Sequence, residues 1–365
     1  MSKTLLEHVF PPKLGEIYDE DFANQLAETQ GAVKSLLQTS RLLQNPDLLM
    51  APILAKEAES SSQLEGTQAS IVDAYQIDLT EQTAEKRNDA LEIRNYESAM
   101  RKGLVALKKY GLNEMAIREM HKTLMTGVRG EDKSPGEYRK KEVWIGKLGT
   151  SKGKARYLPP DPVHVPKMME VLSSYVKDAG KTNPLVACGV IHHRFEAIHP
   201  FEDGNGRVGR LLITLYLVDQ GLLDMPILYP SGYFEENKSD YMDALSKVDK
   251  KEEWKTWLLF FLKGIQFQAE LSLQLVLKID SLYKDAFEKA TAQSTNINLI
   301  KVLDYSFCNP FFTVPFIVRF TDIPSSTVQR YVEILEKLGV IEHSGTFKKQ
   351  KVYVNRKLVD ILREI

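Results

Sequence analysis

The sequence predicts a mainly α-helical fold with one small β-hairpin in its middle and a small C-terminal module of helices and a second strand pair. Two observations predict it. Apolar residues recur every three or four positions through most of the chain, as they do on the buried face of a helix. Short strand-like segments interrupt this pattern only near residues 142–158 and 341–354, and the small, polar stretch 291–296 separates the C-terminal module from the rest.

The overall charge gives no indication of nucleic-acid or membrane binding, because 48 Lys and Arg residues balance 49 Asp and Glu residues. The two cysteines, Cys188 and Cys308, lie far apart, and Cys188 falls in an apolar helical segment, so no disulfide framework is expected. The N-terminus has no signal-peptide core, and the longest apolar runs are too short to span a bilayer. We therefore expect a soluble, cytoplasmic protein.

Residues 1–112 are expected to form a helical region. Within it, residues 47–66 carry an apolar stripe with helical spacing, and Gly66 stands where such a helix would end. Ser61 and Glu65 lie four residues apart and share a face of this helix. A carboxylate in the last turn faces the negative end of the helix dipole. Glu65 is therefore either solvated or paired with an arginine from elsewhere in the fold.

A further helix is expected from Asn113 to about Thr126. Residues 142–146 and 155–158 then look like two short strands joined by a turn at 149–154, within a hairpin region of about 137–160. A single hairpin in a helical protein is either a surface feature with no binding role or an edge to which another strand can bind.

Residues 198–210 form a polar, glycine-rich loop between two apolar helical segments. Successive N–H groups of Gly204, Asn205 and Gly206 can converge on one point, and a helix starting near Arg207 would add unpaired N–H donors and the positive end of its dipole. This pattern predicts an anion cradle that suits a nucleotide phosphate.

Four side chains near the cradle suit phosphate chemistry. Arg207 and Arg210 are three residues apart, so we expect them to share a face and bind neighbouring phosphates. Asp203 offers Mg²⁺ a carboxylate, and His199 has the ordinary pKa of a general base. The simpler alternative is a glycine-rich turn with two solvated arginines. A zinc site built from His192, His193 and His199 is disfavoured, because adjacent histidines on a helix point apart.

Beyond the loop, a helix containing Tyr241 and Leu245 is expected. Such a pair can sandwich a purine, although it more often belongs to a core. Residues 253–290 are strongly helical. The C-terminal segment then reads as helices at 297–305, 314–320 and 325–338, followed by strands at 341–344 and 351–354, which resembles a winged helix-turn-helix. Residues 296–365 hold ten basic and seven acidic residues, a net charge of +3, which is modest for a DNA-binding module.

The loop sequence resembles the core motif of Fic-domain proteins, His-x-Phe-x-(Asp/Glu)-Gly-Asn-Gly-Arg-x-x-Arg, and matches every specified position. Most such proteins transfer AMP from ATP to a hydroxyl side chain of a target protein. The resemblance implies that His199 is the general base, that Asp203 holds Mg²⁺, and that Arg210 binds the γ-phosphate. It implies a wider set of ATP-binding residues: Glu65, Gly204, Asn205, Gly206, Arg207, Val208, Gly209, Arg210 and Tyr241. Phe201 is expected to anchor the loop in the core.

Two other segments resemble parts of the same family. Ser61, Glu65 and Gly66 match the inhibitory motif that one Fic class carries ahead of the core, in which the glutamate pairs with the second motif arginine, here Arg210. The expected hairpin resembles the Fic flap, whose edge near Ile145 and Gly146 would bind the target by strand addition. Arg139 and Trp144 could support this flap.

The expected organisation is an N-terminal region at 1–112, a Fic core at 113–264 with its motif at 199–210, a connecting helix and linker at 265–294, and a winged helix-like domain at 295–365. The expected function is an autoinhibited protein adenylyltransferase that uses ATP and Mg²⁺. Two alternatives remain open. The protein could be a nucleotide-sensing transcriptional regulator that binds DNA through its C-terminal domain, or a transferase of another phosphate-containing group, including removal of AMP. Homodimerisation through the C-terminal module is a further expectation.

Overall fold

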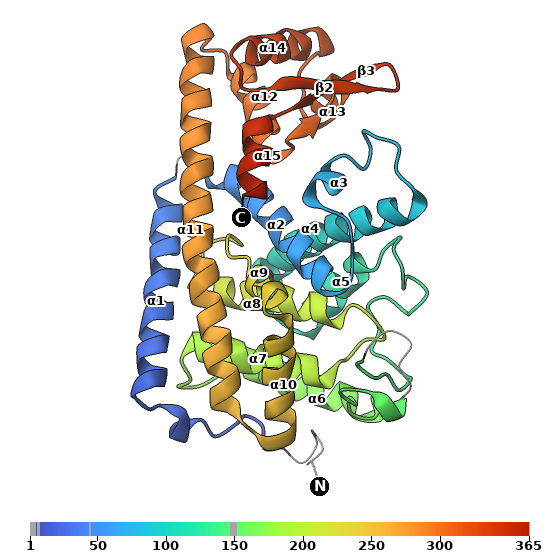
Figure 1. Cartoon of the computed structure of the whole chain (residues 1–365), viewed down its shortest axis with the longest axis vertical. Coiled ribbons are helices and arrows are strands. Elements are labelled where there is room, and N and C mark those ends of the chain that lie inside the picture. The colour runs from blue at the N-terminus through green and yellow to red at the C-terminus, as the bar shows by residue number, and fades with distance from the viewer. Residues whose placement is uncertain (1–4, 6–7, 44, 147–151, 365) are drawn as a thin grey trace.

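The computed structural model describes residues 5, 8–43, 45–146 and 152–364, and it is mainly helical, as expected (Figure 1). The helices up to the end of the expected connecting segment are α1 (Glu20–Arg41), α2 (Pro46–Leu64), α3 (Ile71–Tyr75), α4 (Ala84–Tyr110), α5 (Glu114–Leu124), α6 (Val165–Lys177), α7 (Pro184–Ile198), α8 (Asn205–Asp219), α9 (Ser231–Glu236), α10 (Lys238–Lys251) and α11 (Trp254–Gln293). Short 3₁₀ turns lie at η2 (Gly15–Ile17), η3 (Lys152–Lys154) and η4 (Pro162–His164). No helix in the described ranges is long and apolar enough to cross a membrane.

Helices α7 and α8 form the centre of the fold. Almost every residue of both is buried, including several polar and charged ones, so neither helix has the one-sided apolar face of a surface helix. Asn113 caps α5 by accepting a hydrogen bond from the N–H of Ala116, as its position predicted. On one side of the molecule, α1 runs alongside α11 (Figure 1).

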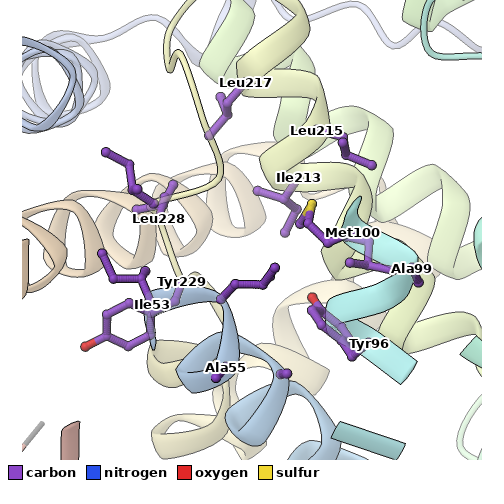
Figure 2. Packing of buried hydrophobic residues seen from close by; sticks show 14 of the residues in the cluster. Ile53, Ala55, Tyr96, Ala99, Met100, Ile213, Leu215, Leu217, Leu228 and Tyr229 are labelled. Carbon is purple, nitrogen blue, oxygen red and sulfur yellow. The ribbon is translucent and has the colours of Figure 1, made fainter. Parts of the chain in front are cut away.

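Helix α2 is packed on several sides, by α4, α8, α9 and the C-terminal module. Figure 2 shows Ile53 of α2 beside Tyr229 and Leu228, with Ala55 of α2, Tyr96 of α4 and side chains of α8 around the same part of the core. A carboxylate is buried here: Glu57 accepts hydrogen bonds from the hydroxyl of Tyr96 at 2.7 Å and from the N–H of Ser231 at 2.9 Å. Burial raises the pKa of Glu57 to about 7, because removal from water disfavours the charged form.

The C-terminal module contains the expected helices and strand pair. Its elements are α12 (Ile297–Cys308), β1 (Phe311–Phe312), α13 (Val314–Phe320), α14 (Ser325–Lys337), β2 (Glu342–Phe347), β3 (Gln350–Val354) and α15 (Arg356–Arg363). The antiparallel sheet has the strand order β1-β3-β2. Strand β1 and helix α15 were not predicted. Both are short, and the two residues of β1 pair with β3 across some forty positions of sequence.

The connecting segment is helical, as expected for residues 253–290, and its helix is slightly longer than expected. Helix α11 continues through residue 264 without interruption and ends only at Gln293, so just residues 294–296 separate it from α12. The C-terminal module also packs on α2 through α12 and on α11 through α12 and α15. It is therefore docked onto the helical body rather than suspended from a long linker.

Candidate functional site

The loop between α7 and α8 begins and ends with left-handed backbone. His199, the C-cap of α7, has φ 51°, and Gly204, the N-cap of α8, has φ 74°. Glycine adopts this conformation at little steric cost, whereas it is uncommon for histidine. The helix begins at Asn205, two residues earlier than expected, so Asn205 and Gly206 are helical and of the expected three residues only Gly204 has positive φ. The backbone that was expected to form the cradle is therefore the N-cap and first turn of α8.

Side chains within and beneath the loop hold its shape. The amide of Asn205 accepts a hydrogen bond from the N–H of Phe201 at 2.8 Å and donates one to its carbonyl at 2.9 Å. Phe201 is fully buried, as expected, and stacks on His121 with ring centroids 3.8 Å apart. Nδ1 of His121 accepts from the N–H of Gly136, which leaves Nε2 as the donor to the carbonyl of Asp203 at 3.0 Å. The side chain of Asn205 thus braces the loop.

Arg139 joins the loop to the flap. Its guanidinium donates from Nε to the carbonyl of His199 at 2.7 Å and also donates to the carbonyl of Pro160. Its own N–H donates to the carbonyl of Pro200 at 2.8 Å. Since the Arg139 side chain is buried, this arginine stabilises the backbone on both sides of the catalytic-base candidate. The side chain of Trp144, the other expected flap support, is 45% exposed.

The flap is less regular than expected. The two expected strands are reduced to a single antiparallel bridge between Ile145 and Tyr157, in which the N–H of Ile145 donates to the carbonyl of Tyr157 at 3.0 Å. Tyr157 also donates from its hydroxyl to the carbonyl of Ala197 at the end of α7, at 2.9 Å. The first half of the expected turn, residues 149–151, lies outside the described residues, and Lys152–Lys154 form a 3₁₀ turn.

A cavity of about 450 Å³ lies between the end of α2, the flap, the end of α7, the start of α8 and α10. It brings together expected site residues that are far apart in sequence: Glu65, Gly66, Ile145, Gly146, His199, Gly206, Arg210, Tyr241 and Leu245. The side chains of Asp203, Asn205 and Arg207 do not line it.

Arg210 and Glu65 form a salt bridge at the wall of this cavity. Nη2 of Arg210 donates to Oε1 of Glu65 at 2.7 Å and to the carbonyl of Ser61 at 2.8 Å, and Nε donates to the hydroxyl of Ser61 at 2.8 Å. Burial, the largest single influence, acts to raise the pKa of Glu65, but the charge of Arg210, its hydrogen bond and the charge of Arg207 together hold the pKa below its ordinary value. Glu65 caps α2, so the arginine supplies the positive charge that this helix end favours.

Gly206 makes the close approach of this pair possible. A Cβ atom at position 206 would lie 2.2 Å from Oε1 of Glu65 and 2.9 Å from Nη1 of Arg210. Any other residue would push the carboxylate away from the first turn of α8. Glycine is therefore needed at position 206 because a side chain there would collide with Glu65, whereas the sequence suggested that it was needed for a special backbone conformation.

Arg207 and Arg210 lie three residues apart on α8 but have different partners. The guanidinium of Arg207 is buried and donates to Oε2 of Glu92 on α4 at 3.1 Å. Glu92 also accepts from the hydroxyl of Thr67 at 2.8 Å, so this buried charge pair has a further hydrogen bond. The two arginines therefore approach two different carboxylates, one on α4 and one on α2. Glu92 was missed from sequence, and no local pattern marks it.

Asp203 is paired with a lysine that the sequence did not indicate. Its carboxylate accepts from Nζ of Lys133 at 2.8 Å and from the N–H of Gly204 at 2.7 Å. Burial, the largest single influence, acts to raise the pKa of Asp203, but the hydrogen bond and charge of Lys133, the charge of Arg207 and the N–H of Gly204 together hold the pKa below its ordinary value. Within the described ranges no group of three or more His, Cys, Asp or Glu side chains could hold a metal ion. One ionised carboxylate beside a phosphate cradle still fits Mg²⁺, which commonly takes one or two carboxylates and completes its shell with phosphate oxygens and water.

His199 is poised as a neutral base. Its Nδ1 lies 3.3 Å from the carbonyl of Glu196, an acceptor, so Nδ1 carries the proton and Nε2 is the basic nitrogen. Burial lowers the pKa of His199 to about 4. Glu196 also lines the cavity. Burial raises its pKa to about 8, and its Oε1 has no hydrogen-bond partner among the described residues.

Tyr241 is held in place by residues on the side away from the cavity. It is buried, stacks on Phe234 with ring centroids 4.8 Å apart, and donates its hydroxyl proton to Nε2 of His192 at 2.8 Å. Nδ1 of His192 in turn donates to the carbonyl of Gly209 at 3.0 Å. His192 therefore links the cavity wall to α8 and has no nitrogen left for a metal. Lys238, also missed from sequence, donates to the carbonyl of Leu64 at 2.6 Å beside the cavity.

The chain is similar to known proteins along more than half of its length. The Fic/DOC family matches residues 111–217, and the Fic/DOC family N-terminal region matches residues 23–105. A probable protein adenylyltransferase of Aquifex aeolicus is 35% identical over 117 residues, which are 32% of this chain and 32% of that protein. A protein adenylyltransferase of Caenorhabditis elegans is 25% identical over 131 residues, 35% of this chain and 22% of that protein. The matches thus span about a third or less of these relatives.

Solved structures show the same fold. A Fic family protein from Desulfovibrio desulfuricans superposes with a TM-score of 0.59 at 18% identity and covers 92% of this chain and 96% of that one. A Fic domain containing signaling protein from Bacteroides thetaiotaomicron superposes with a TM-score of 0.53 at 22% identity and covers 70% of this chain and 97% of that one. With its family matches and its helical fold, the chain belongs to the Fic/DOC family.

Proposed function

We propose that this protein is a protein adenylyltransferase, which moves AMP from ATP to a Tyr, Ser or Thr hydroxyl of a target protein or of the chain itself. One observation carries the proposal: a single cavity is lined by the neutral base His199, by the start of α8, by Arg210 and by the flap. The names of the relatives in Aquifex aeolicus and Caenorhabditis elegans support the same type of reaction.

In the proposed reaction, the acceptor hydroxyl oxygen attacks the α-phosphorus of ATP. The bond from that phosphorus to the bridging oxygen of the β-phosphate breaks, and pyrophosphate leaves. Nε2 of His199 takes the proton of the hydroxyl as the new bond forms. Its low pKa keeps the imidazole neutral at physiological pH, so it is always available to accept the proton.

The phosphates would bind at the first N–H groups of α8, at Gly204, Asn205 and Gly206, where the helix dipole favours negative charge. Arg210 would hold the γ-phosphate, and the buried charge of Arg207 would add to the positive potential beneath the cradle. Asp203 would hold Mg²⁺, whose chemistry there is to neutralise charge on the phosphate oxygens. Tyr241 and Leu245, which line the wall on α10, would contact the adenine, and the edge at Ile145 and Gly146 would position the target.

The Glu65 carboxylate would compete with ATP in this scheme. It takes Nη2 of Arg210, and one arginine cannot serve both the carboxylate and the γ-phosphate fully. We propose that Ser61, Glu65 and Gly66 at the end of α2 make the resting enzyme autoinhibited.

Position-specific labelling of ATP tests the reaction. The purified chain, alone and mixed with a protein extract, is incubated with Mg-ATP labelled at the α- or the γ-phosphate. AMP transfer predicts protein-bound label from the α position only. The variant His199→Ala should lose the transfer and keep ATP binding, while His164→Ala, at an exposed histidine, should behave as the wild type. Label from the γ position alone, or full transfer by His199→Ala, would overturn the proposal.

A further inference from the structure

A second cavity, of about 950 Å³, lies where the C-terminal module meets the N-terminal helices. Its walls come from α2, α3 and α4 on one side and from α12, β1 and α13 on the other. It shares no lining residue with the cavity of the proposed transfer reaction. Figure 1 shows α3 and α13 on neighbouring parts of the molecule, away from α7, α8 and α10.

Three arginines line this cavity from both sides. Arg94 and Arg101 lie two turns apart on α4, and Arg319 lies in the last turn of α13. Arg94 pairs with Asp78 at 2.7 Å, but Arg101 and Arg319 make no hydrogen bond or salt bridge with any residue in the described part of the chain. Both side chains are exposed, and the guanidinium carbon of Arg319 lies 5.9 Å from the ring centroid of Phe320. Two guanidinium groups without a carboxylate partner at one cavity favour an anion there, and guanidinium is well matched to phosphate.

The acidic groups of the lining offset the charge of these arginines only in part, and the charges of Arg101 and Arg94 both act on Glu97. Asp78 is already shared between Arg94 and Arg87. Glu97 lies on α4 between Arg94 and Arg101, and burial raises its pKa to about 7, so it carries only part of a charge at neutral pH. A net positive charge is therefore left in the cavity.

The rest of the lining suits a flat ring that carries polar groups. Phe320, 69% exposed at the rim, lies with its ring centroid 6.2 Å from that of Tyr305. Phe316 also lines the space, and the buried hydroxyl of Tyr75 has no hydrogen-bond partner among the described residues. A buried hydroxyl without a partner is unfavourable, so it favours a ligand with a polar group. The volume also far exceeds the space that a lone phosphate needs, and it lies in the range of small-molecule sites.

We propose that this cavity binds a nucleoside phosphate, with its phosphates at Arg101 and Arg319 and its base against Phe320. The site is separate from the proposed transfer reaction and does not depend on it. An aromatic ring stacks on the face of any nucleobase. The lining therefore indicates that the ligand is a nucleoside phosphate, but it does not indicate which base the ligand carries.

ATP is the probe for a test by equilibrium dialysis with the full chain. The wild type should bind ATP at two sites, and Arg210→Ala should weaken only the site beside α8. The double variant Arg101→Ala/Arg319→Ala should keep that site and bind the second ATP about 100-fold more weakly, because removing each charge-assisted hydrogen bond weakens binding about tenfold. Lys102→Ala, at an exposed residue next to Arg101, is the matched control and should retain both sites.

Two further measurements test the nucleoside part. Phe320→Ala removes an exposed side chain and should leave folding intact, yet weaken the second site. Tripolyphosphate carries the same phosphates without a base and should compete more weakly than ATP there. The proposal is overturned if the double arginine variant binds ATP as the wild type does, or if tripolyphosphate equals ATP and Phe320→Ala has no effect. A single ATP site that disappears in the double variant but persists in Arg210→Ala would support the second cavity and contradict the ATP site beside α8.

Discussion

Replacement of Glu65 by glycine should raise the rate of adenylylation, because it removes the carboxylate that holds Nη2 of Arg210. The contact is a charge-assisted hydrogen bond of 2.7 Å, and such bonds contribute about 1.5–3 kcal/mol. The Glu65 side chain is 38% exposed, so solvent screening favours the lower half of that range. At about 1.4 kcal/mol per factor of ten, the arginine should become roughly 10- to 50-fold more available to the γ-phosphate.

The same change should cost stability. Arg210 is 2% exposed and would keep only its two bonds to Ser61, so a buried charge would be left without its carboxylate. We expect the free energy of unfolding to fall by about 1–3 kcal/mol. Bound ATP should restore part of it, because the γ-phosphate supplies a new partner for the guanidinium.

The assay compares initial rates of transfer from α-labelled ATP for the wild type, Glu65→Gly, Glu65→Gln and Glu65→Gly with Arg210→Ala. Glu65→Gln keeps a neutral hydrogen-bond acceptor, so its rate should lie between the wild type and Glu65→Gly. The double variant should lose the gain, since the released arginine is what activates. Equal rates for the wild type and Glu65→Gly, with ATP bound equally tightly, would refute the reasoning and leave the Glu65 contact a purely structural one.

Four other predictions follow from the site. Because burial lowers the pKa of His199 to about 4, transfer should fall only as the pH approaches that value, and an inflection near pH 6.5 in a pH–rate profile would contradict the assignment. Lys133→Ala should lower the Mg²⁺ concentration for half-maximal transfer a few-fold, because the partly exposed lysine competes with Mg²⁺ for the Asp203 carboxylate. Asp203→Ala should abolish both transfer and its metal dependence. Folding raises the pKa of Glu57 from about 4.5 to about 7, so the folded state binds this proton more tightly than the unfolded state. Stability should therefore fall as the pH rises from 4.5 to 7. The melting temperature of Glu57→Gln should depend less on pH over this range than that of the wild type. Arg139→Lys should lose the planar fork that binds several carbonyls and lower both the melting temperature and the transfer rate, which a calorimetric scan and the label assay would measure.

The elements that local sequence specifies were predicted well. The helix expected at 47–66 is found as α2, with Glu65 at its end, because a periodic stripe and a terminal glycine are local signals. A loop also lies between two buried helices, as the flanking apolar runs indicated, although it spans only residues 199–204 rather than 198–210.

The partners of the motif residues could not be predicted, because they depend on how distant helices pack. Glu92 meets Arg207 across more than a hundred positions, and Lys133 meets Asp203 from a loop whose only signal was its charge and glycine content. The role of Gly206 was misassigned for the same reason: its missing Cβ makes room for Glu65, which approaches from another helix. The flap was over-predicted as two strands, since its alternating residues form a single bridge.

Helix α11 determines how far the C-terminal module can reach. Its 40 residues span about 60 Å as one uninterrupted helix, with α1 alongside it. A flexible chain of the same length would have an average end-to-end distance of only about 35 Å and would let the module sample many positions. Here the helix acts as a spacer of fixed length, and residues 294–296 leave little freedom at its end. A partner bound at α14 would therefore stand at a constant separation from His199, and its size, rather than the flexibility of a linker, would decide whether it reaches that histidine.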